Sequence, residues 1–441
     1  MAGGAGVRKS AMGRFLTALV LLVVALPAAG GAERGADRTA GAHAAVAAAS
    51  APRELARVGS TPRLDEIISP VREFQPDPAL AALGKRLFFD GGLSRPAGTS
   101  CAVCHDPSHG YSGLNGGRDG VARGSRPGHF SPRNTPSLLY VRYVPPLYFY
   151  QDDDALAPAP FGGLMADGRA DTLARQAALP LLNPDEMNNR TGADVAASLA
   201  RAPYATEFAA RFGPRALHDG ATALAAAGAA IEAFLQSDEM APFTSRYDDF
   251  VRGRGQLGAE ELRGMALFRN PDKGNCASCH QFSPTSTNPA RSPFTDFGYD
   301  AIAVPRNRAL VPNRDPRHFD AGLCATARTR GWPEPDAWCG WFRTPTLRNV
   351  AERGRYMHNG AFGDLREVLR FYATRATAPD DWYPHGDRFD DLPKAQRGNV
   401  NANSVPYNRR PGAPPAFDDA EIDAIVAFLR TLSDRPAITR P

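Results

Sequence analysis

The chain has 441 residues, enough for two domains of ordinary size, each with a buried core. Hydrophobic residues make up 43% of it, which excludes an intrinsically disordered protein, while 42 glycines and 39 prolines predict many loops and short helices. The formal net charge of +4 falls to about +1 (4 minus 3) if Arg8, Lys9 and Arg14 are removed with an N-terminal segment, so charge gives no support for nucleic-acid binding.

The first 32 residues have the pattern of a signal peptide. Arg8, Lys9 and Arg14 precede an apolar run over residues 15–26, and small residues follow at 28–32. A membrane anchor is the alternative, but the run is short for a bilayer span, so we expect cleavage, a periplasmic location and no stable membrane span. Residues 33–65 are rich in Ala, Gly and Arg without periodicity, which predicts a flexible linker.

Two C-x-x-C-H motifs carry the strongest chemical signal. They comprise Cys101, Cys104 and His105, and then Cys276, Cys279 and His280. In such a motif two thiols can attach to one edge of a haem macrocycle, and the adjacent histidine falls beneath the iron as its proximal ligand. A redox C-x-x-C pair or a zinc site is the alternative for either motif alone. Two complete copies on an exported chain favour two covalently attached haem c groups.

The other two cysteines, Cys324 and Cys339, lack motif neighbours. In an oxidising compartment such a pair predicts a disulfide that closes a short loop.

The two motifs lie within a long internal repeat. The repeated features are Gly84, Leu87 and Phe88 with Gly264, Leu267 and Phe268, then residues 135–138 with 344–347, and 167–168 with 359–360. This pattern predicts two haem modules related by internal duplication, with a boundary near residues 245–258. We therefore expect an N-terminal haem c domain over residues 66–248 and a C-terminal haem c domain over residues 249–441.

Periodicity predicts a mostly α fold. Helices are expected over residues 78–88, 223–235 and 260–268, and two more are expected to begin at Asp364 and Asp418, each with a Glu three residues later. Strand patterns are scarce. We expect two cytochrome-c-like domains with the haems near their interface, and we consider the last helix a candidate for packing on the first domain.

The repeat also bears on the sixth coordination position of each haem. Aligned without gaps from Gly168 and Gly360, the first half has Pro180 where the second half has Tyr372. Proline has no side-chain donor, whereas a Tyr oxygen can ligate iron, so we expect an open first haem and a second haem closed by Tyr372. A core tyrosine with a satisfied hydroxyl is the equal alternative at this point.

Residues 176–186 carry candidate peroxide chemistry near the open haem. Glu186 is placed to move protons during O–O cleavage, and Gln176 to orient the oxidant or a water. From spacing alone, a solvated surface carboxylate is the better reading of Glu186.

Six segments give a family resemblance over nearly the whole mature length. They are residues 87–88, 132–136, 167–173, 183–188, 342–349 and 356–360. With these segments the chain resembles the bacterial dihaem cytochrome c peroxidase and MauG family. The resemblance implies a peroxidatic N-terminal haem, an electron-transferring C-terminal haem, and Glu186 as distal acid–base with Gln176 beside it. It favours Tyr372 over Met357 as the iron ligand, because MauG-like members use Tyr there and the peroxidases use Met.

The chain departs from the family at several positions. Ala166 stands where many members have a relay Trp between the haems, and Trp338, Trp341 and Phe161 are unranked substitutes. His109 and His129 lie in the loop that supplies a distal ligand in classical peroxidases, but a solvated histidine suits both better.

The resemblance also implies an interdomain calcium ion. Asn134 would supply its side-chain ligand, and the backbone carbonyls of Arg353 and Arg355 would supply others. Two arginines make a less inviting surrounding for a cation.

Three functions follow from these observations. The first is a peroxidase that reduces hydrogen peroxide with electrons from a small donor protein, either a cytochrome c or a cupredoxin. The second is a MauG-like oxidase of aromatic residues in a partner protein, which Tyr372 favours and Ala166 weakens. The third is an electron carrier without peroxide chemistry, against which Glu186 and Gln176 argue.

Overall fold

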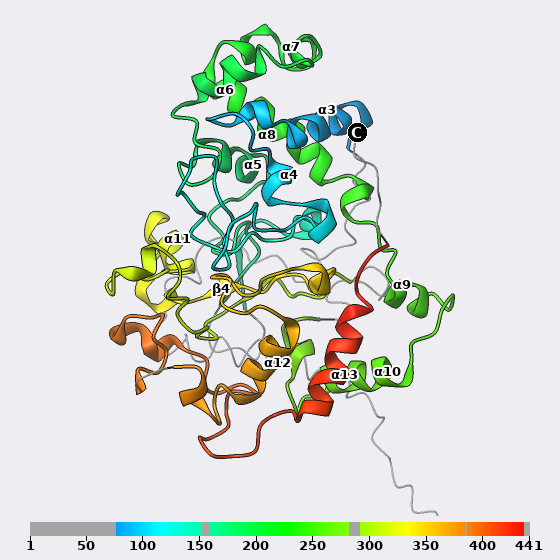
Figure 1. The fold of residues 1–441 in the computed structure, drawn as a ribbon, viewed down its shortest axis with the longest axis vertical. Coiled ribbons are helices and arrows are strands. Elements are labelled where there is room, and N and C mark those ends of the chain that lie inside the picture. Colours follow the sequence, from blue (N-terminus) through cyan, green and yellow to red (C-terminus); the bar gives the residue numbers. More distant parts are fainter. Residues whose placement is uncertain (1–75, 152–157, 282–291, 384–385, 436–441) are drawn as a thin grey trace, which may run out of the picture.

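The computed structural model describes residues 76–151, 158–281, 292–383 and 386–435. The expected signal peptide and the expected linker both lie outside these residues. The described part is mostly helical with short strands, which confirms the predicted fold class at this level (Figure 1). Within it, no helix combines the length and apolar character needed to cross a bilayer.

The helices and strands of the described residues are short. The α-helices are α3 (Pro78–Phe89), α4 (Cys101–Cys104), α5 (Leu173–Leu182), α6 (Gly192–Leu199), α7 (Ala205–Phe212), α8 (Gly220–Leu235), α9 (Arg246–Val251), α10 (Ala259–Arg269), α11 (Leu323–Thr329), α12 (Leu365–Thr374) and α13 (Asp419–Arg430). The strands β1 (Tyr148–Tyr150) and β2 (Ala159–Phe161) form one antiparallel pair, and β3 (Tyr299–Asp300) and β4 (Phe342–Arg343) form another.

Side-chain caps explain where the main helices begin. The Asp77 carboxylate accepts a hydrogen bond from the Ala79 amide, and α3 then starts at Pro78, whose missing N–H costs nothing in the first turn. Asp418 and Glu421 cap α13 reciprocally. At α12 the Asp364 carboxylate accepts from the Glu367 amide, but the Glu367 carboxylate accepts from Gly363 instead, so the predicted box closes one residue earlier.

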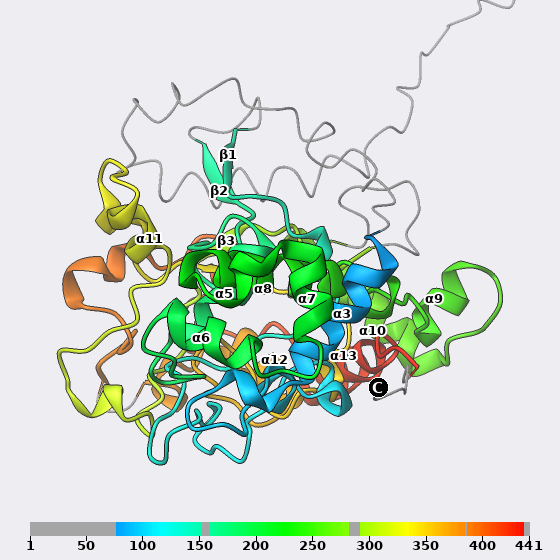
Figure 2. The same ribbon diagram turned by 90° about the horizontal axis from the view of Figure 1, so that it is seen from above.

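The repeated glycines mark two close helix crossings. A Cβ atom added to Gly84 would lie 1.8 Å from the Ala230 carbonyl oxygen, and one added to Gly264 would lie 1.9 Å from that of Ala424. The absence of a side chain therefore lets α3 pack tightly on α8, and α10 on α13. Figure 2 shows α5 next to α8, on the side opposite α3.

Two hydrophobic clusters follow the order of the sequence. The first draws its buried residues from positions 83–243 and the second from positions 247–432. The last helix packs on α10 and α12 in the second cluster, because Ile422, Ile425 and Leu429 form its buried face. It does not form its main packing with the first half, although Asp434 beyond it accepts a hydrogen bond from Tyr140 at 2.6 Å.

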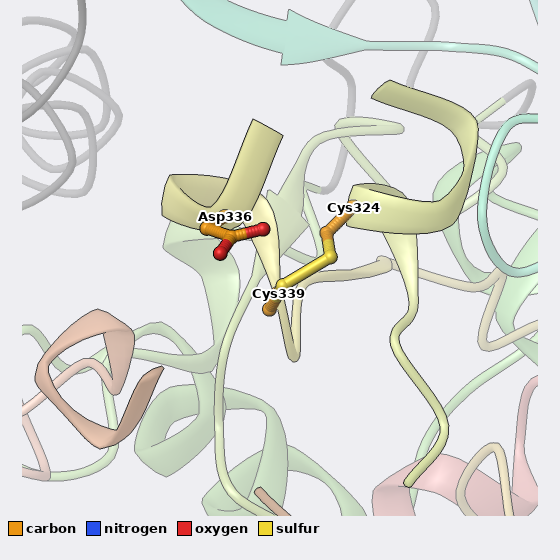
Figure 3. A group of neighbouring side chains, drawn as sticks. All are labelled: Cys324, Asp336 and Cys339. Carbon is orange, nitrogen blue, oxygen red and sulfur yellow. A yellow bond between two sulfur atoms is a disulfide. The ribbon is translucent and has the colours of Figure 1, made fainter. Parts of the chain in front are cut away.

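Cys324 and Cys339 form the predicted disulfide. It joins α11 to the 3₁₀ turn Pro335–Trp338, with the Asp336 carboxylate beside the two sulfurs (Figure 3). Because each sulfur is bonded to the other, this cluster offers no thiolate to a metal ion.

Candidate functional site

Both C-x-x-C-H motifs open into one cavity of about 710 Å³. Its walls come from both hydrophobic clusters, and every described residue of the two motifs except Ala102, Val103 and Ala277 lines it. The candidate residues Asn134, Gln176, Pro180, Glu186 and Tyr372 also line it. The structure thus brings together residues that are up to about 270 positions apart (Tyr372 minus Cys101) in the sequence.

The two motif histidines have matching geometry. His105 Nδ1 lies 3.0 Å from the Tyr111 carbonyl oxygen, and His280 Nδ1 lies 3.1 Å from that of Phe294. This bond makes Nδ1 the protonated nitrogen and leaves Nε2 as the lone-pair donor. Burial lowers the pKa of each imidazole to about 4, so both rings are neutral, as a metal ligand requires.

Burial favours the neutral thiol form of three of the motif cysteines. Burial raises the pKa of Cys101, Cys104 and Cys276 to about 12. A redox C-x-x-C pair depends on a lowered thiol pKa, so these raised values argue against it. The neutral histidine that follows each pair suits attachment of a haem.

Other groups on the cavity wall are suited to a polar ligand. Gln176 Oε1 and Arg353 Nε are buried and have no hydrogen-bond partner among the described residues. Buried polar atoms without partners are costly, so such atoms indicate a bound group. Together with the two motifs they form a donor set that fits haem.

Glu186 lies beside the first motif. It follows α5, lines the cavity, and its charge contributes to the raised pKa of both Cys101 and Cys104. Burial raises the pKa of the Glu186 carboxyl, and nearby Arg169 partly opposes this shift. The structure therefore places Glu186 on the cavity wall and not on the open surface that its spacing alone suggested.

Gln176 lies on the same helix as Pro180. Its side chain is buried, with Nε2 3.9 Å from Met165 Sδ and Oε1 unpartnered. The amide is thus held on the wall with one acceptor free.

Tyr372 lies beside the second motif. Burial raises the pKa of its hydroxyl, and the thiols of Cys279 and Cys276 add to the shift. Its side chain is partly accessible, and it lines the cavity together with Met357. The phenol is therefore near the Cys276–His280 motif, as iron ligation would require, and its role stays a prediction.

The loop histidines do not line the cavity. His109 is exposed, with Nδ1 3.3 Å from Asp106 Oδ2, and His129 Nδ1 lies 2.9 Å from Asp185 Oδ1. Each histidine thus has a partly exposed carboxylate as its partner, as expected for a solvated loop histidine.

A stacked pair that sequence reasoning missed lies on the wall with Ala166. The rings of Phe342 and His358 are 3.7 Å apart and nearly parallel, at 14°. Both residues lie in segments that carried the family resemblance, but nothing in their spacing indicated contact. The substitutes Trp338, Trp341 and Phe161 do not line the cavity.

Asn134 lies where the halves meet. Its Nδ2 donates to the carbonyl oxygens of Arg355 at 3.0 Å and Met357 at 3.1 Å. The buried Arg353 guanidinium donates to the Thr135 carbonyl at 3.0 Å. One of the two expected carbonyl ligands therefore lies next to Asn134, and calcium binding stays a prediction.

A mostly helical fold whose two C-x-x-C-H motifs face one cavity fits the class of di-haem proteins. The family model described as di-haem cytochrome c peroxidase matches residues 78–256. The methylamine utilization protein MauG of Paracoccus denitrificans is 38% identical over 81% of this chain and 89% of its own length. The chain belongs to the di-haem cytochrome c peroxidase and MauG family, as its sequence motifs predicted.

Other relatives and solved structures agree. Cytochrome c551 peroxidase of Pseudomonas aeruginosa is 27% identical over 68% of this chain and 74% of its own. The diheme peroxidase BthA from Burkholderia thailandensis is 57% identical, with a TM-score of 0.79 over 85% of this chain and 89% of that one. The protein is therefore an oxidoreductase acting on peroxide, and its family implies two haem cofactors.

Proposed function

We propose that this chain is an exported di-haem c-type peroxidase that reduces hydrogen peroxide with electrons from a small redox protein. Its N-terminal haem, held by Cys101, Cys104 and His105, is the peroxide site. Its C-terminal haem, held by Cys276, Cys279 and His280, is the electron-transfer site. The observation that carries the proposal is that Glu186 and Tyr372 line one cavity at opposite motifs.

The internal repeat supports the assignment of two haem domains. The helices α5 and α12 each have ten residues and begin five positions after Gly168 or Gly360, which have φ angles of 67° and 66°. The bridges Leu164–Ala170 and Tyr356–Phe362 precede them at equivalent positions. We infer an ancient duplication, with domains over residues 66–248 and 249–441 and a cleaved signal peptide over residues 1–32.

When bound, the haem iron supplies a binding position for a peroxide oxygen and a store of electrons. The protein residues supply the protons and the orientation. Glu186, whose pKa is raised by burial, holds a proton at its carboxyl and delivers it to the oxygen that leaves as water. Gln176 Oε1 accepts a hydrogen bond from the second O–H and fixes the orientation of the oxidant. Pro180 has no side-chain donor, so the place that Tyr372 takes in the second half stays open.

A specific observation favours a MauG-like oxidase as the second candidate. Tyr372 rather than a thioether stands at the eighth position of α12 beside the second motif. A phenolate ligand stabilises higher oxidation states of iron, which oxidation of an aromatic residue in a partner protein would need. A plain electron carrier is disfavoured, because it would have no use for the Glu186 carboxyl group beside a haem site that lacks a sixth ligand.

The proposal includes a calcium ion between the halves, with Asn134 and the carbonyl oxygens of Arg353 and Arg355 as its ligands. Amide and carbonyl oxygens are ligands that calcium prefers. Elemental analysis after dialysis against a chelator tests this part separately.

Steady-state peroxide turnover with a reduced cytochrome c tests the main proposal. We expect donor oxidation that requires peroxide and saturates in both substrates. A protein that reacts with peroxide but oxidises no donor, and that modifies aromatic residues of a co-expressed exported protein, would favour the second candidate. A protein whose spectrum is unchanged by peroxide would be the electron carrier.

A further inference from the structure

Three of the four tryptophans form a continuous aromatic series beside the cavity. The ring centroids of Trp332 and Trp338 are 6.3 Å apart, and those of Trp338 and Trp341 are 5.4 Å apart, both edge to face. Phe149 of β1 packs against Trp332 at 4.7 Å and Trp338 at 5.9 Å. Rings at these distances are in van der Waals contact, so an electron can pass from one ring to the next without crossing a gap.

The series runs from the residue directly behind the cavity wall to the surface. Trp341 is 2% exposed and precedes Phe342, whose ring lines the cavity and stacks on His358. Trp332, at the other end, is partly exposed. Trp338, at 1% exposure, connects the two ends.

The buried indoles differ from an ordinary core tryptophan. The Nε1 atoms of Trp338 and Trp341 are buried and have no hydrogen-bond acceptor within the described part of the chain. The fourth tryptophan, Trp382, donates to Thr374 Oγ1 at 2.9 Å. Buried indole N–H groups usually find a partner, so two adjacent orphans call for an explanation.

An indole without a nearby base has a particular redox property. When it loses an electron, its N–H proton has no acceptor and stays in place. The oxidised ring then keeps its full oxidising power and takes an electron from the next ring, whereas deprotonation would leave a weaker oxidant trapped there. The orphan N–H groups thus suit Trp338 and Trp341 to passing a charge onward.

The disulfide holds this series in position. Cys339 follows Trp338 directly and is bonded to Cys324 of α11, which closes the loop that contains Trp332 (Figure 3). Arg328 of α11 donates to Asp336 at 2.6 Å across the same loop. A loop closed by a disulfide loses little further conformational entropy when it holds the three rings in contact.

We propose that Trp341, Trp338 and Trp332 form an electron relay between the cavity and the protein surface. This inference rests on the proposed peroxide chemistry. Hydrogen peroxide is the final acceptor, and each molecule takes two electrons and two protons to give two waters. One electron at a time passes inward from Trp332 to Trp338 and from Trp338 to Trp341, with no bond made or broken in the relay. A one-electron donor protein that contacts the surface at Trp332 restores its electron.

The test uses the holoenzyme and peroxide without a donor. An oxidised Trp332 then stays unreduced and takes one oxygen atom from water, with loss of two electrons and two protons in all. Peptide mass spectrometry locates this product. The variants are Trp341→Phe and Trp338→Phe, which keep an aromatic ring that peroxide-derived oxidants cannot easily oxidise, and Trp382→Phe is the matched control outside the series.

We expect oxygen incorporation at Trp332 in the parent and in Trp382→Phe, and its loss in Trp341→Phe and Trp338→Phe. Haem content and the resting spectrum, measured first, show which variants are folded. One folded variant of the two, Trp341→Phe or Trp338→Phe, is enough for the test. If the enzyme reacts with peroxide but both inner variants keep the parent yield at Trp332, the relay is wrong and the proposed function stands. If peroxide leaves the haem spectrum unchanged, the proposed function fails and the relay fails with it, because no other oxidant present removes electrons from indole.

Discussion

Pro180 and Tyr372 occupy the same place in the two halves of the molecule. Each is the eighth residue of a ten-residue helix, α5 or α12, and each side chain lines the shared cavity. One has no donor atom and the other has a phenol beside the second motif. This single difference separates an open peroxide site from a closed electron-transfer site in the proposed function.

The first prediction concerns attachment. We expect two covalent haems per chain by the pyridine haemochrome assay, because both motifs present protonated, buried thiols beside a neutral histidine. The double variant Cys276→Ser with Cys279→Ser should keep one. A parent protein that yields one haem would contradict the assignment of the second motif.

The second prediction concerns the open position at Pro180. Electron paramagnetic resonance of the resting ferric enzyme should show a high-spin signal from the N-terminal haem. The Pro180→Met variant offers a thioether at that place and should convert part of this signal to low spin. Two low-spin haems in the parent would point to another ligand, and His109 and His129 are then the residues to replace.

The third prediction concerns Tyr372. Its replacement by Met removes an anionic ligand, so the reduction potential of the C-terminal haem should rise and its low-spin spectrum should change. Spectroelectrochemistry measures both effects. The control is Tyr407→Phe, because Tyr407 also lines the cavity and stacks on Tyr372 at 6.1 Å without being the expected ligand. An unchanged potential in Tyr372→Met would make Tyr372 a packing residue.

The fourth prediction concerns Glu186. The Glu186→Gln variant keeps the size of the side chain but holds no transferable proton, so O–O cleavage should slow by roughly 10²–10⁴-fold. Stopped-flow mixing with peroxide follows the reaction. The Glu232→Gln variant is the control, since burial raises the pKa of that carboxyl too but Glu232 does not line the cavity. Reaction of Glu186→Gln at the parent rate would remove Glu186 from the mechanism.

The fifth prediction concerns the helix crossings. A methyl group at Gly264 would lie 1.9 Å from the Ala424 carbonyl oxygen, which is backbone and cannot turn aside. Gly264→Ala should therefore separate α10 from α13 and lower the free energy of unfolding by ~1–3 kcal/mol. Gly398→Ala is the control, because a Cβ atom there meets no atom within 4 Å. Thermal unfolding of the two variants gives the comparison, and equal midpoints would show that the crossing can relax.

The sequence alone determined the chemistry that depends on neighbouring residues. Two thiols and an imidazole must lie within about one turn of the chain to hold one macrocycle, so each motif can be recognised from the sequence alone. The starts of the helices at Pro78 and Asp419 could also be predicted, because a helix cap is a local interaction over about three residues. The repeat placed Tyr372 opposite Pro180 because duplicated helices keep the same length.

Only the tertiary structure decided which distant side chains meet. Spacing suggested a solvated Glu186, but the fold places its carboxyl on the cavity wall beside the first motif. The stacking of Phe342 on His358 and the series from Trp332 to Trp341 were likewise invisible in the sequence. Contacts of this kind depend on how loops without periodicity pack against helices, and that packing is a property of the whole folded chain rather than of any local pattern.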